Sequence, residues 1–388
     1  MTHELHRAHR AFPVHRMSLE RRVPGIQMRI AADQKAWREQ GRLLAYCSMS
    51  SGFGAWLKGM VSAYAISLLT ERALLLNWHQ CPIAGAGHVG SDIADYFEGR
   101  GFDWNARHAA IGVGVRVLKV HLNPRSGEFN RTHAGGTSLS IRTLLEVHAG
   151  EHAGPDKVMR NEANKRRLSA TFAWDASAQD TWAELHWSAF DLLLNPSRRL
   201  SALAAAFFAQ HAMKGVEGGG PPMFVALHAR LGDGEMNAPR TAALRSDMVS
   251  AATAASYASE LRPSAMRTDP LGALSCFDQL GAGARLLITD SVEARDCAVR
   301  NGVLTTEGRA VHLGSAHTFP REHIDKVMLD WWLLASATEA GTLDHSTFLE
   351  TARWRHQGRS PMVFRQGCNR SSTAYQAPCD VSRVVRAG

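Results

Sequence analysis

The feature that most constrains this fold is a strand, a glycine turn, a helix and a second strand that follow one another near the start of the chain. The segments LLAYCSM (43–49) and ALLLNW (73–78) have the apolar character of buried strands. Between them, AWLKGMVSAYAISLLTER (55–72) has the spacing of an amphipathic helix. This order predicts two parallel strands in one sheet, and therefore an α/β protein.

The glycines of the turn, Gly52 and Gly54, come directly after the first strand. The carboxyl ends of parallel strands form the edge at which ligands bind, and glycines there let backbone N–H groups approach a ligand. Two glycines also suit a tight turn from a strand into a helix without any ligand. Both interpretations stay open at this point.

The length favours two domains. The chain has 388 residues, more than one hydrophobic core usually supports. The glycine- and proline-rich segment VEGGGPP is the best candidate for a linker. We therefore expect a disordered basic tail over residues 1–25, a first domain over 26–215, a linker over 216–222 and a second domain over 223–388.

The net charge and the hydropathy exclude several partners. The charge of +8 is spread over the whole length and favours anionic ligands, but no pattern of a nucleic-acid-binding module accompanies it. No run of about 18 apolar residues is present, and the start lacks the apolar region of a signal peptide. We expect neither a nucleic-acid partner nor a membrane segment.

The six cysteines are too few and too scattered for a disulfide scaffold, and none forms a C-x-x-C zinc pair. Cys368 and Cys379 are the closest pair along the chain. We expect them to be bridged in a secretory lumen and to be free thiols in the cytosol.

The second half repeats the α/β pattern. Apolar runs predict strands at 223–228, 285–290 and 310–313. Helices are expected at about 292–300 and over REHIDKVMLDWWLLASAT (321–338). Two such domains joined by a linker predict a cleft between them, with the strand ends of the second domain facing it.

Polar side chains follow the first strand of this second half. The segment FVALHARLGDGE (224–235) begins as a buried strand and then places His228, Arg230, Asp233 and Glu235 at and beyond its end. Because the carboxyl ends of such strands face the ligand crevice, we expect these side chains to face a ligand.

Two features of this half suit a diphosphate. Arg230 offers a planar fork for phosphate, and HSTF places Ser346 and Thr347 at the start of a helix, where N–H groups also attract an anion. The alternatives are a surface ion pair of Arg230 with Asp233 or Glu235, and an ordinary Ser/Thr helix cap.

These segments, in this order, resemble the GDP-fucose-dependent fucosyltransferases of the xyloglucan, core α1,6 and protein O-fucosyl types. The similarity covers about residues 43–100 and 190–365. It rests on six stretches: GFGAWLKGMVSAYAISLLTERALLLNW, NPSRRLSALAAAFF, ALHARLGDG, LLITDS, LDWWLLASAT and HSTF.

The resemblance implies a GT-B fold, in which two Rossmann-like domains, the first on the acceptor side, face each other across a cleft. It implies an inverting transfer of fucose from GDP-fucose to a glycan or glycoprotein acceptor, without a cofactor or catalytic metal, in a Golgi or endoplasmic reticulum setting. Positive charge and dipoles then stabilise the departing GDP. Two alternatives remain, a GT-B transferase that uses another nucleotide sugar and a non-catalytic binding protein on this scaffold.

The resemblance also assigns roles to individual residues. Arg230 becomes the β-phosphate ligand, and Asp233 a candidate general base. The implied nucleotide-sugar site comprises His228, Arg230, Asp290, Asp330, Ser346, Thr347, Phe348, Gly52 and Gly54, with His228 and Asp330 on guanine.

Four positions depart from the expected pattern or carry an alternative. Ala55 and Trp56 stand where the family commonly has Asn-Arg, and Leu231 where several members carry a second arginine. Asp330 falls at the edge of an apolar helical stripe, where it is either solvated or paired with Lys326 one turn back, unless it accepts the N–H groups of guanine.

Overall fold

In its described residues the protein is an α/β structure with two four-stranded parallel sheets and a short antiparallel pair of strands. The prediction of an α/β protein with parallel strands is confirmed. The computed structural model describes residues 13–48, 52–76, 93–109, 111, 115–122, 143–149, 158–159, 161–172, 181–213, 222–229, 274–308, 320–343 and 346–356.

The first sheet has the strand order β2-β1-β5-β4, and all its neighbours are parallel. The helix α3 connects β1 to β2, as the opening pattern predicts. The bounds are β1 (Leu43–Ser48), α3 (Phe53–Thr70), β2 (Ala73–Leu75), β4 (Arg116–Leu122) and β5 (Thr143–Ala149).

The helix α3 is buried along most of its length, which explains why apolar residues occupy nearly every position. Its Gly59 lies directly against Tyr46 of β1, whose hydroxyl donates to the carbonyl of Trp56 at 2.9 Å. Tyr64 bonds Ser188 at 3.0 Å, and burial raises the pKa of the Tyr64 phenol well above its ordinary value. These contacts hold α3 between the sheet and the helices behind it.

The second sheet has the order β10-β7-β8-β9, again with all neighbours parallel. Strand β9 follows α12 along the chain and was not predicted. The strand expected at 310–313 lies outside the described residues. The bounds are β7 (Phe224–Ala229), η3 (Ser275–Gln279), β8 (Ala284–Thr289), α12 (Val292–Arg300), β9 (Leu304–Thr305), α13 (Arg321–Ser336), β10 (Glu339–Thr342) and α14 (Thr347–His356).

The remaining elements lie between β2 and β4 and between β5 and β7 along the chain. Helix α8 begins after the cap Ser197, whose hydroxyl accepts the N–H of Leu200. The bounds are η1 (Ile93–Asp95), β3 (Phe97–Glu98), η2 (Ala106–His108), α6 (Glu162–Phe172), α7 (Thr181–Leu193), β6 (Asn195–Pro196) and α8 (Arg198–Gln210).

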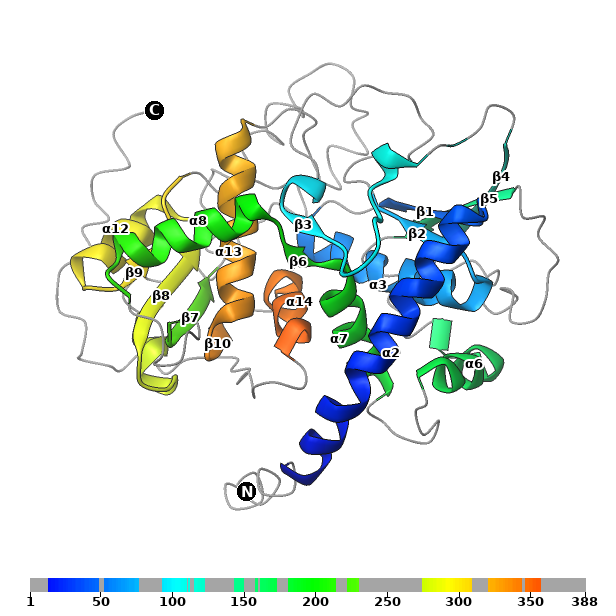
Figure 1. The fold of residues 1–388 in the computed structure, drawn as a ribbon. Helices are drawn as coiled ribbons and strands as arrows, with labels where there is room; N and C mark the ends of the chain where they lie inside the picture. The colour runs from blue at the N-terminus through cyan, green and yellow to red at the C-terminus, as the bar shows by residue number, and fades with distance from the viewer. Residues whose placement is uncertain are drawn as a thin grey trace, which may run out of the picture.

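The amino-terminal helix corrects one expectation. Helix α2 (Pro13–Glu39) begins inside the segment 1–25 that was expected to be a disordered tail, so the tail does not extend through residues 13–25. The later turns of α2 bury Ile30 and Gln34 against the first half, and the earlier turns continue the same helix away from the body (Figure 1). A helix that is anchored at one end propagates at little cost, because only the first turn must be nucleated.

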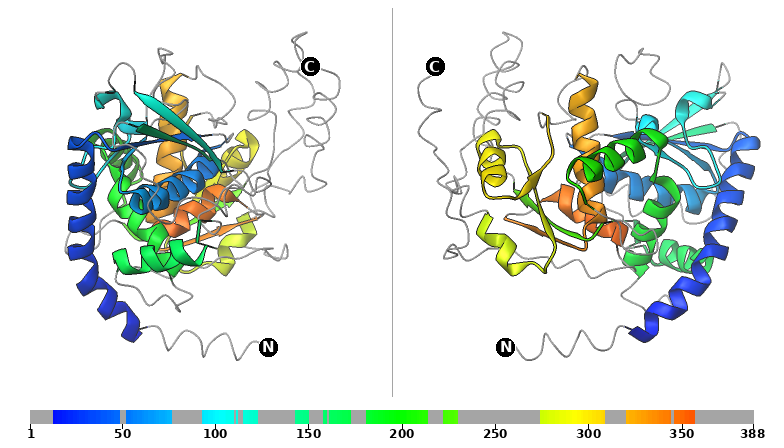
Figure 2. Two further views of the ribbon diagram at one scale, coloured as in Figure 1. Left: turned by 90° about the vertical axis from the view of Figure 1, so that its right-hand side faces the viewer. Right: turned by 60° about the vertical axis from the view of Figure 1, so that its left-hand side comes forward.

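Helices α13 and α14 stand between the two sheets (Figures 1 and 2). Helix α14 packs on α3 and α7 of the first half, and α13 packs on α8 and α14. Trp331 of α13 is surrounded by Phe53, Phe97 and Phe190, with ring centroids 5.5, 5.7 and 5.9 Å away. One apolar cluster therefore includes residues of both halves.

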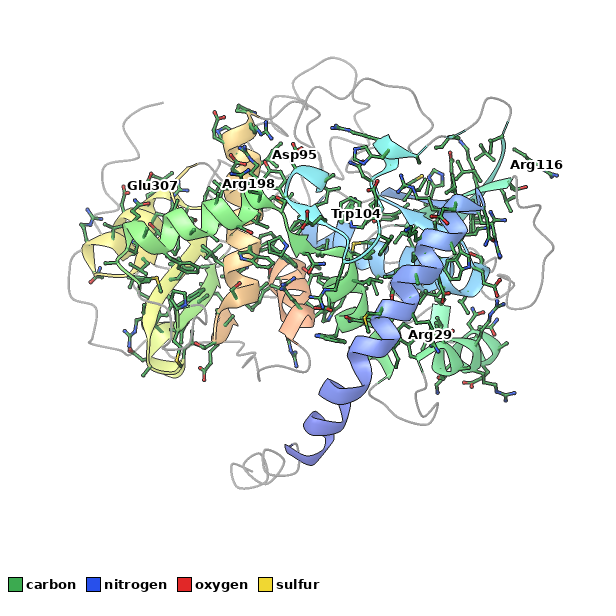
Figure 3. All side chains as sticks on the ribbon, in the orientation of Figure 1. Arg29, Asp95, Trp104, Arg116, Arg198 and Glu307 are labelled. Atoms are coloured by element: carbon green, nitrogen blue, oxygen red, sulfur yellow. The ribbon has the colours of Figure 1, made fainter. Side chains whose placement is uncertain are left out.

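Polar contacts tie the same surfaces together. Arg199 of α8 binds Asp325 of α13 through two nitrogens, and the Tyr96 hydroxyl donates to the same carboxylate at 2.8 Å. The hydrogen bond to Asp325 raises the pKa of Arg199. Asp95 lies beside the first turn of α13 (Figure 3), where it pairs with Arg321 at 3.2 Å. These bonds fix α13 against the first half.

Within the described residues, no helix is long and apolar enough to cross a membrane. The cysteines of this part of the chain, Cys47, Cys276 and Cys297, are each disulfide-bonded. Cys368 and Cys379, the pair expected from spacing, lie outside the described residues. The domain boundary at 216–222 stays a prediction, because only its last residue is described.

We expect Gly59→Ala to lower the free energy of unfolding by about 1–3 kcal/mol, the usual cost of overpacking a core. An added Cβ would lie 2.2 Å from the Tyr46 hydroxyl oxygen. Gly25→Ala in α2 is the matched control, because its Cβ would meet nothing within 4 Å and alanine favours a helix by about 1 kcal/mol. Urea unfolding measures both; equal stabilities would contradict the close packing of α3 on β1.

Candidate functional site

The candidate site lies at the carboxyl edge of the second sheet, between β7 and β10. From β7 the chain adds β8 and β9 on one side and then crosses to add β10 on the other. In open parallel sheets, ligands bind at the carboxyl ends of the strands where the order reverses in this way. His228 of β7 is the register partner of Thr342 at the end of β10, so both strands end at this point.

Helix α14 begins at this edge, a few residues after β10 ends. The Ser346 hydroxyl accepts the N–H of Leu349 at 3.2 Å, and its carbonyl accepts the N–H of Glu350 at 2.9 Å. Ser346 is therefore the helix cap, as the alternative interpretation states. The amino end of this helix carries partial positive charge from its aligned peptide dipoles, which favours an anion.

Phe348, in the first turn of α14, connects three elements. Its ring lies 5.5 Å from the imidazole of His228 and 6.3 Å from the ring of Phe53 at the start of α3. The structure thus brings His228 and Phe348 together. Thr347 and Phe348 are both half-buried.

The glycine turn of the first half meets the same helix end. A Cβ on Gly54 would lie 2.6 Å from the carbonyl carbon and oxygen of Thr347 and 2.7 Å from the nitrogen of Phe348. Only a residue without a side chain permits this backbone contact. The role of Gly54 is therefore close packing of α3 on α14, which neither of the two interpretations drawn from the sequence includes.

Gly52 has a different role. It is the residue before α3, with an extended backbone (φ −146°, ψ 160°), and its carbonyl accepts the N–H of Trp56 at 2.9 Å. This conformation suits any residue, so it agrees with a strand-to-helix turn and requires no glycine.

The two residues that depart from the family pattern are core residues. Ala55 and Trp56 are 4% and 2% exposed, and the Trp56 ring packs on Tyr46 and Phe53 with centroids 5.4 and 6.2 Å away. One turn further along the helix, Lys58 reaches α14 instead and pairs with Glu350 at 2.8 Å. The side of α3 that faces α14 therefore carries a single charge at this point.

Asp290 lies at the same edge, immediately after β8. It is buried, and the preceding Thr289 is the register partner of Ala229, the last residue of β7. The next residue, Ser291, caps α12 by accepting the N–H of Ala294 at 3.2 Å. The structure thus places Asp290 beside the point where the chain leaves β7. Arg230 and Asp233, the expected phosphate ligand and base, follow that point and lie outside the described residues.

Asp330 is buried rather than at the edge of its helix, which corrects the expected position. It is 4% exposed, and its carboxylate accepts from Thr306 at 2.5 Å and from Lys326 at 2.9 Å. The pair with Lys326 is therefore present. The Lys326 ammonium also donates to Thr306 at 2.6 Å, so the three groups form a closed buried cluster.

Sequence reasoning named Lys326 as a partner but missed Thr306. Thr306 directly follows β9, so it stands at the same carboxyl edge as His228 and Asp290. No strand was expected at Leu304–Thr305, so no strand end marked Thr306 as a candidate. The buried cluster joins the end of β9 to α13.

No family model and no curated protein sequence match this chain. Among solved structures, the chain is similar to Arabidopsis thaliana FUT1 in complex with GDP, with 13% identity, a TM-score of 0.47, and coverage of 84% of this chain and 71% of that chain.

Two further structures are similar to this one. They are fucosyltransferase NodZ from Bradyrhizobium (13% identity, TM-score 0.40, 80% of this chain and 92% of that chain) and POFUT1 in complex with GDP (12%, 0.43, 84% and 99%). The similarity concerns the arrangement of helices and strands, and no residue of the site is assigned from it.

We expect Gly54→Ala to separate α3 from the start of α14, because backbone atoms of Thr347 cannot move aside cheaply. The free energy of unfolding should fall by about 1–3 kcal/mol. Gly341→Ala in β10 is the control, since its Cβ would meet only side-chain carbons at 3.4–3.8 Å. Thermal unfolding of both variants measures the difference, and a Gly54→Ala protein as stable as Gly341→Ala would contradict the contact.

We expect Asp330→Ala to cost about 3–5 kcal/mol, because it leaves the ammonium of Lys326 buried without its carboxylate. The double variant Lys326→Met/Asp330→Leu removes both charges and should recover most of that loss. Urea unfolding of both variants measures how much of the free energy of unfolding the double variant recovers. A double variant at least as unstable as Asp330→Ala would show that the two charges do not depend on each other.

Proposed function

We propose that this chain is a glycosyltransferase that transfers fucose from GDP-fucose to a glycan or glycoprotein acceptor with inversion. The observation that carries the proposal is the start of α14, which lies at the reversal point of the second sheet beside His228 and against the turn between β1 and α3. The segments that meet there are those in which the chain resembles GDP-fucose-dependent transferases.

The diphosphate of the donor binds at the amino end of α14 in this proposal. Thr347 and Phe348 supply backbone N–H groups of the first turn, and the helix dipole favours the negative charge. Arg230 adds a bidentate contact to the β-phosphate, where charge develops as GDP departs. Such preorganised charge stabilises the leaving group without a metal ion. Asp233 is the candidate base from this half.

The guanine base is proposed to contact His228 and Asp330, with Asp290 nearby. An ionised carboxylate accepts both the N1–H and the N2–H of guanine, and adenine offers no such pair. Because Asp330 already accepts from Thr306 and Lys326, guanine must use the remaining lone pairs or displace one partner. This is a specific cost that the proposal includes.

A second candidate function is GDP or glycan binding without transfer. The observation that favours it is the burial of Ala55 and Trp56, which leaves no polar side chain at two positions where the resembling family commonly has Asn-Arg. Release of GDP from GDP-fucose separates the two functions, because a binding protein holds GDP and does not cleave the donor.

The setting of this activity is proposed to be an oxidising compartment. Cys47, Cys276 and Cys297 are disulfide-bonded and buried. Disulfides persist in secreted and lumenal proteins and are rare in reducing compartments. A Golgi or endoplasmic reticulum setting agrees with this, and thiol labelling of the unfolded protein without reductant tests it.

We expect GDP to raise the melting temperature and UDP to leave it unchanged, because a ligand that binds only the folded state stabilises it by mass action. At a hundredfold excess over the dissociation constant, the stabilisation is about 2.7 kcal/mol. A chelator should not alter the shift. Equal shifts with both nucleotides, or none with either, would contradict the donor assignment.

The melting-temperature shifts with GDP and with ADP also test the guanine contact. We expect the Lys326→Met/Asp330→Leu protein to lose part of its preference for GDP over ADP, since the carboxylate is gone while the phosphate contacts remain. Hydrogen bonds to a charged group contribute about 1.5–3 kcal/mol each, so the ratio of affinities should fall roughly tenfold or more. An unchanged ratio would remove Asp330 from the binding site.

A further inference from the structure

The first sheet has its own reversal point, between β1 and β5. From β1 the chain adds β2 on one side, and β5 and β4 lie on the other. By the rule applied to the second sheet, a ligand of the first half binds at the carboxyl ends of β1 and β5. His148 and Glu146 lie there, with His148 in register with Cys47 near the end of β1.

Glu146 is an unusual residue for its position. Its neighbours along β5, Leu144, Leu145 and Val147, are buried apolar residues, yet its carboxylate is also buried, with 3% of the side chain exposed. Burying a carboxylate is costly unless it is paired. A glutamate kept in such a strand therefore points to a role beyond packing.

The carboxylate oxygen Oε2 of Glu146 has two partners. It lies 3.2 Å from Nε2 of His148, two residues further along the strand on the same face, and 3.7 Å from Nζ of Lys119 on β4. The side chain of His148 is 18% exposed and that of Lys119 is 62% exposed. The buried carboxylate thus holds a histidine ring that reaches the surface.

A metal ion is the first alternative for this cluster. Donor atoms of Cys47, Glu146 and His148 lie within 4.8 Å of one another. Cys47 is disulfide-bonded, however, and its sulfur cannot act as a thiolate ligand. Without this sulfur, only the Glu146 carboxylate and the His148 imidazole remain as possible metal ligands, and these two groups already contact each other.

The cluster stands on the edge of the first half that leads to the donor site. Strand β1 ends at Ser48, Gly52 begins the turn into α3, and Gly54 touches Thr347 at the start of α14. Strand β1 and helix α3 follow each other closely along the chain, so the carboxyl edge of the first sheet is linked to the amino end of α14 through the start of α3. An acceptor held at the first edge approaches the donor from that side.

We propose that His148, rather than Asp233, is the catalytic base that takes the proton from the acceptor hydroxyl, and that Glu146 is a positioning residue that orients the imidazole and stabilises its protonated form. This inference rests on the proposed glycosyl transfer. The acceptor oxygen forms a bond to the anomeric carbon of fucose while the bond from that carbon to the phosphate oxygen breaks. The bonding pair leaves with GDP, and the hydroxyl proton goes to the imidazole.

A carboxylate behind an imidazole is suited to this task. The carboxylate holds the ring in one orientation and favours the imidazolium that forms as the proton is transferred. A positioned base of this kind contributes about 10²–10⁴-fold to a rate. The competing role is structural, in which Glu146 only pairs Lys119 and His148 across two strands.

The test uses the full chain, GDP-fucose as donor, and two nucleophiles. Water must lose a proton when it attacks, and azide need not. We expect His148→Gln to slow hydrolysis of GDP-fucose by at least about 10²-fold while the rate of fucosyl azide formation stays within about threefold of wild type. The acid limb of the pH–rate profile for hydrolysis should disappear as well.

Two further variants separate catalysis from structure. Glu146→Gln keeps the shape and a hydrogen bond to His148, so we expect it to fold and to lower kcat for hydrolysis about tenfold or more at unchanged KM. Lys119→Met removes only the ion pair and should leave hydrolysis within about threefold of wild type. Loss of activity in Lys119→Met that equals the loss in Glu146→Gln would assign the cluster to structure and overturn the proposal.

The remaining outcomes are also decisive. Hydrolysis by His148→Gln at the wild-type rate overturns the base assignment and leaves the proposed function standing. If a chelator abolishes GDP-fucose hydrolysis and Zn²⁺ restores it, the cluster is a metal site, and the base assignment of His148 is overturned as well. A wild-type protein that binds no GDP by calorimetry and cleaves no GDP-fucose overturns the proposed function, and this inference with it.

Discussion

The contact between Gly54 and Thr347 is the constraint on which the site depends. Backbone meets backbone here, at the first turn of α3 and the first turn of α14, and a single added carbon would lie 2.6 Å from the carbonyl of Thr347. This contact brings the turn after β1 to the reversal point of the second sheet. It also sets where Phe348 lies between His228 and Phe53. The helix that follows β1 of the first sheet is thereby held against the helix that follows β10 of the second sheet.

Two buried carboxylates of the described residues are paired toward the carboxyl edge of a sheet. Lys326 and Asp330 join Thr306 at the end of β9, and Glu146 holds His148 at the end of β5. A buried ion pair contributes little net stability over apolar residues of similar size. The presence of such a pair is therefore better explained by a specific role of its charged groups than by its contribution to the free energy of unfolding. The first pair fixes the end of β9 against α13, and the second carries a partly exposed imidazole.

Much of the fold could be predicted from the chain. The apolar runs and the helical periodicity identified β1, α3, β7, β8, α12 and α13, and burial on both sides of a parallel sheet gives its strands a continuous apolar signal. Strand β9 has only two residues, Leu304 and Thr305, and so carries too little pattern to be placed. Helix α2 was not predicted either, since its first turns lack the apolar stripe that marks a packed helix.

The sequence by itself determined the class of fold and the candidate residues around α14, because strand, turn and helix signals are local and follow the chain. Tertiary structure alone decided what those residues touch. Gly54 is required by a contact with Thr347, nearly three hundred positions away, and Asp330 is buried because Thr306 folds back onto α13. The pairing of Glu146 with Lys119 likewise depends on the register of β4 and β5. Contacts of this kind depend on packing between distant segments, and no periodicity in the sequence encodes them.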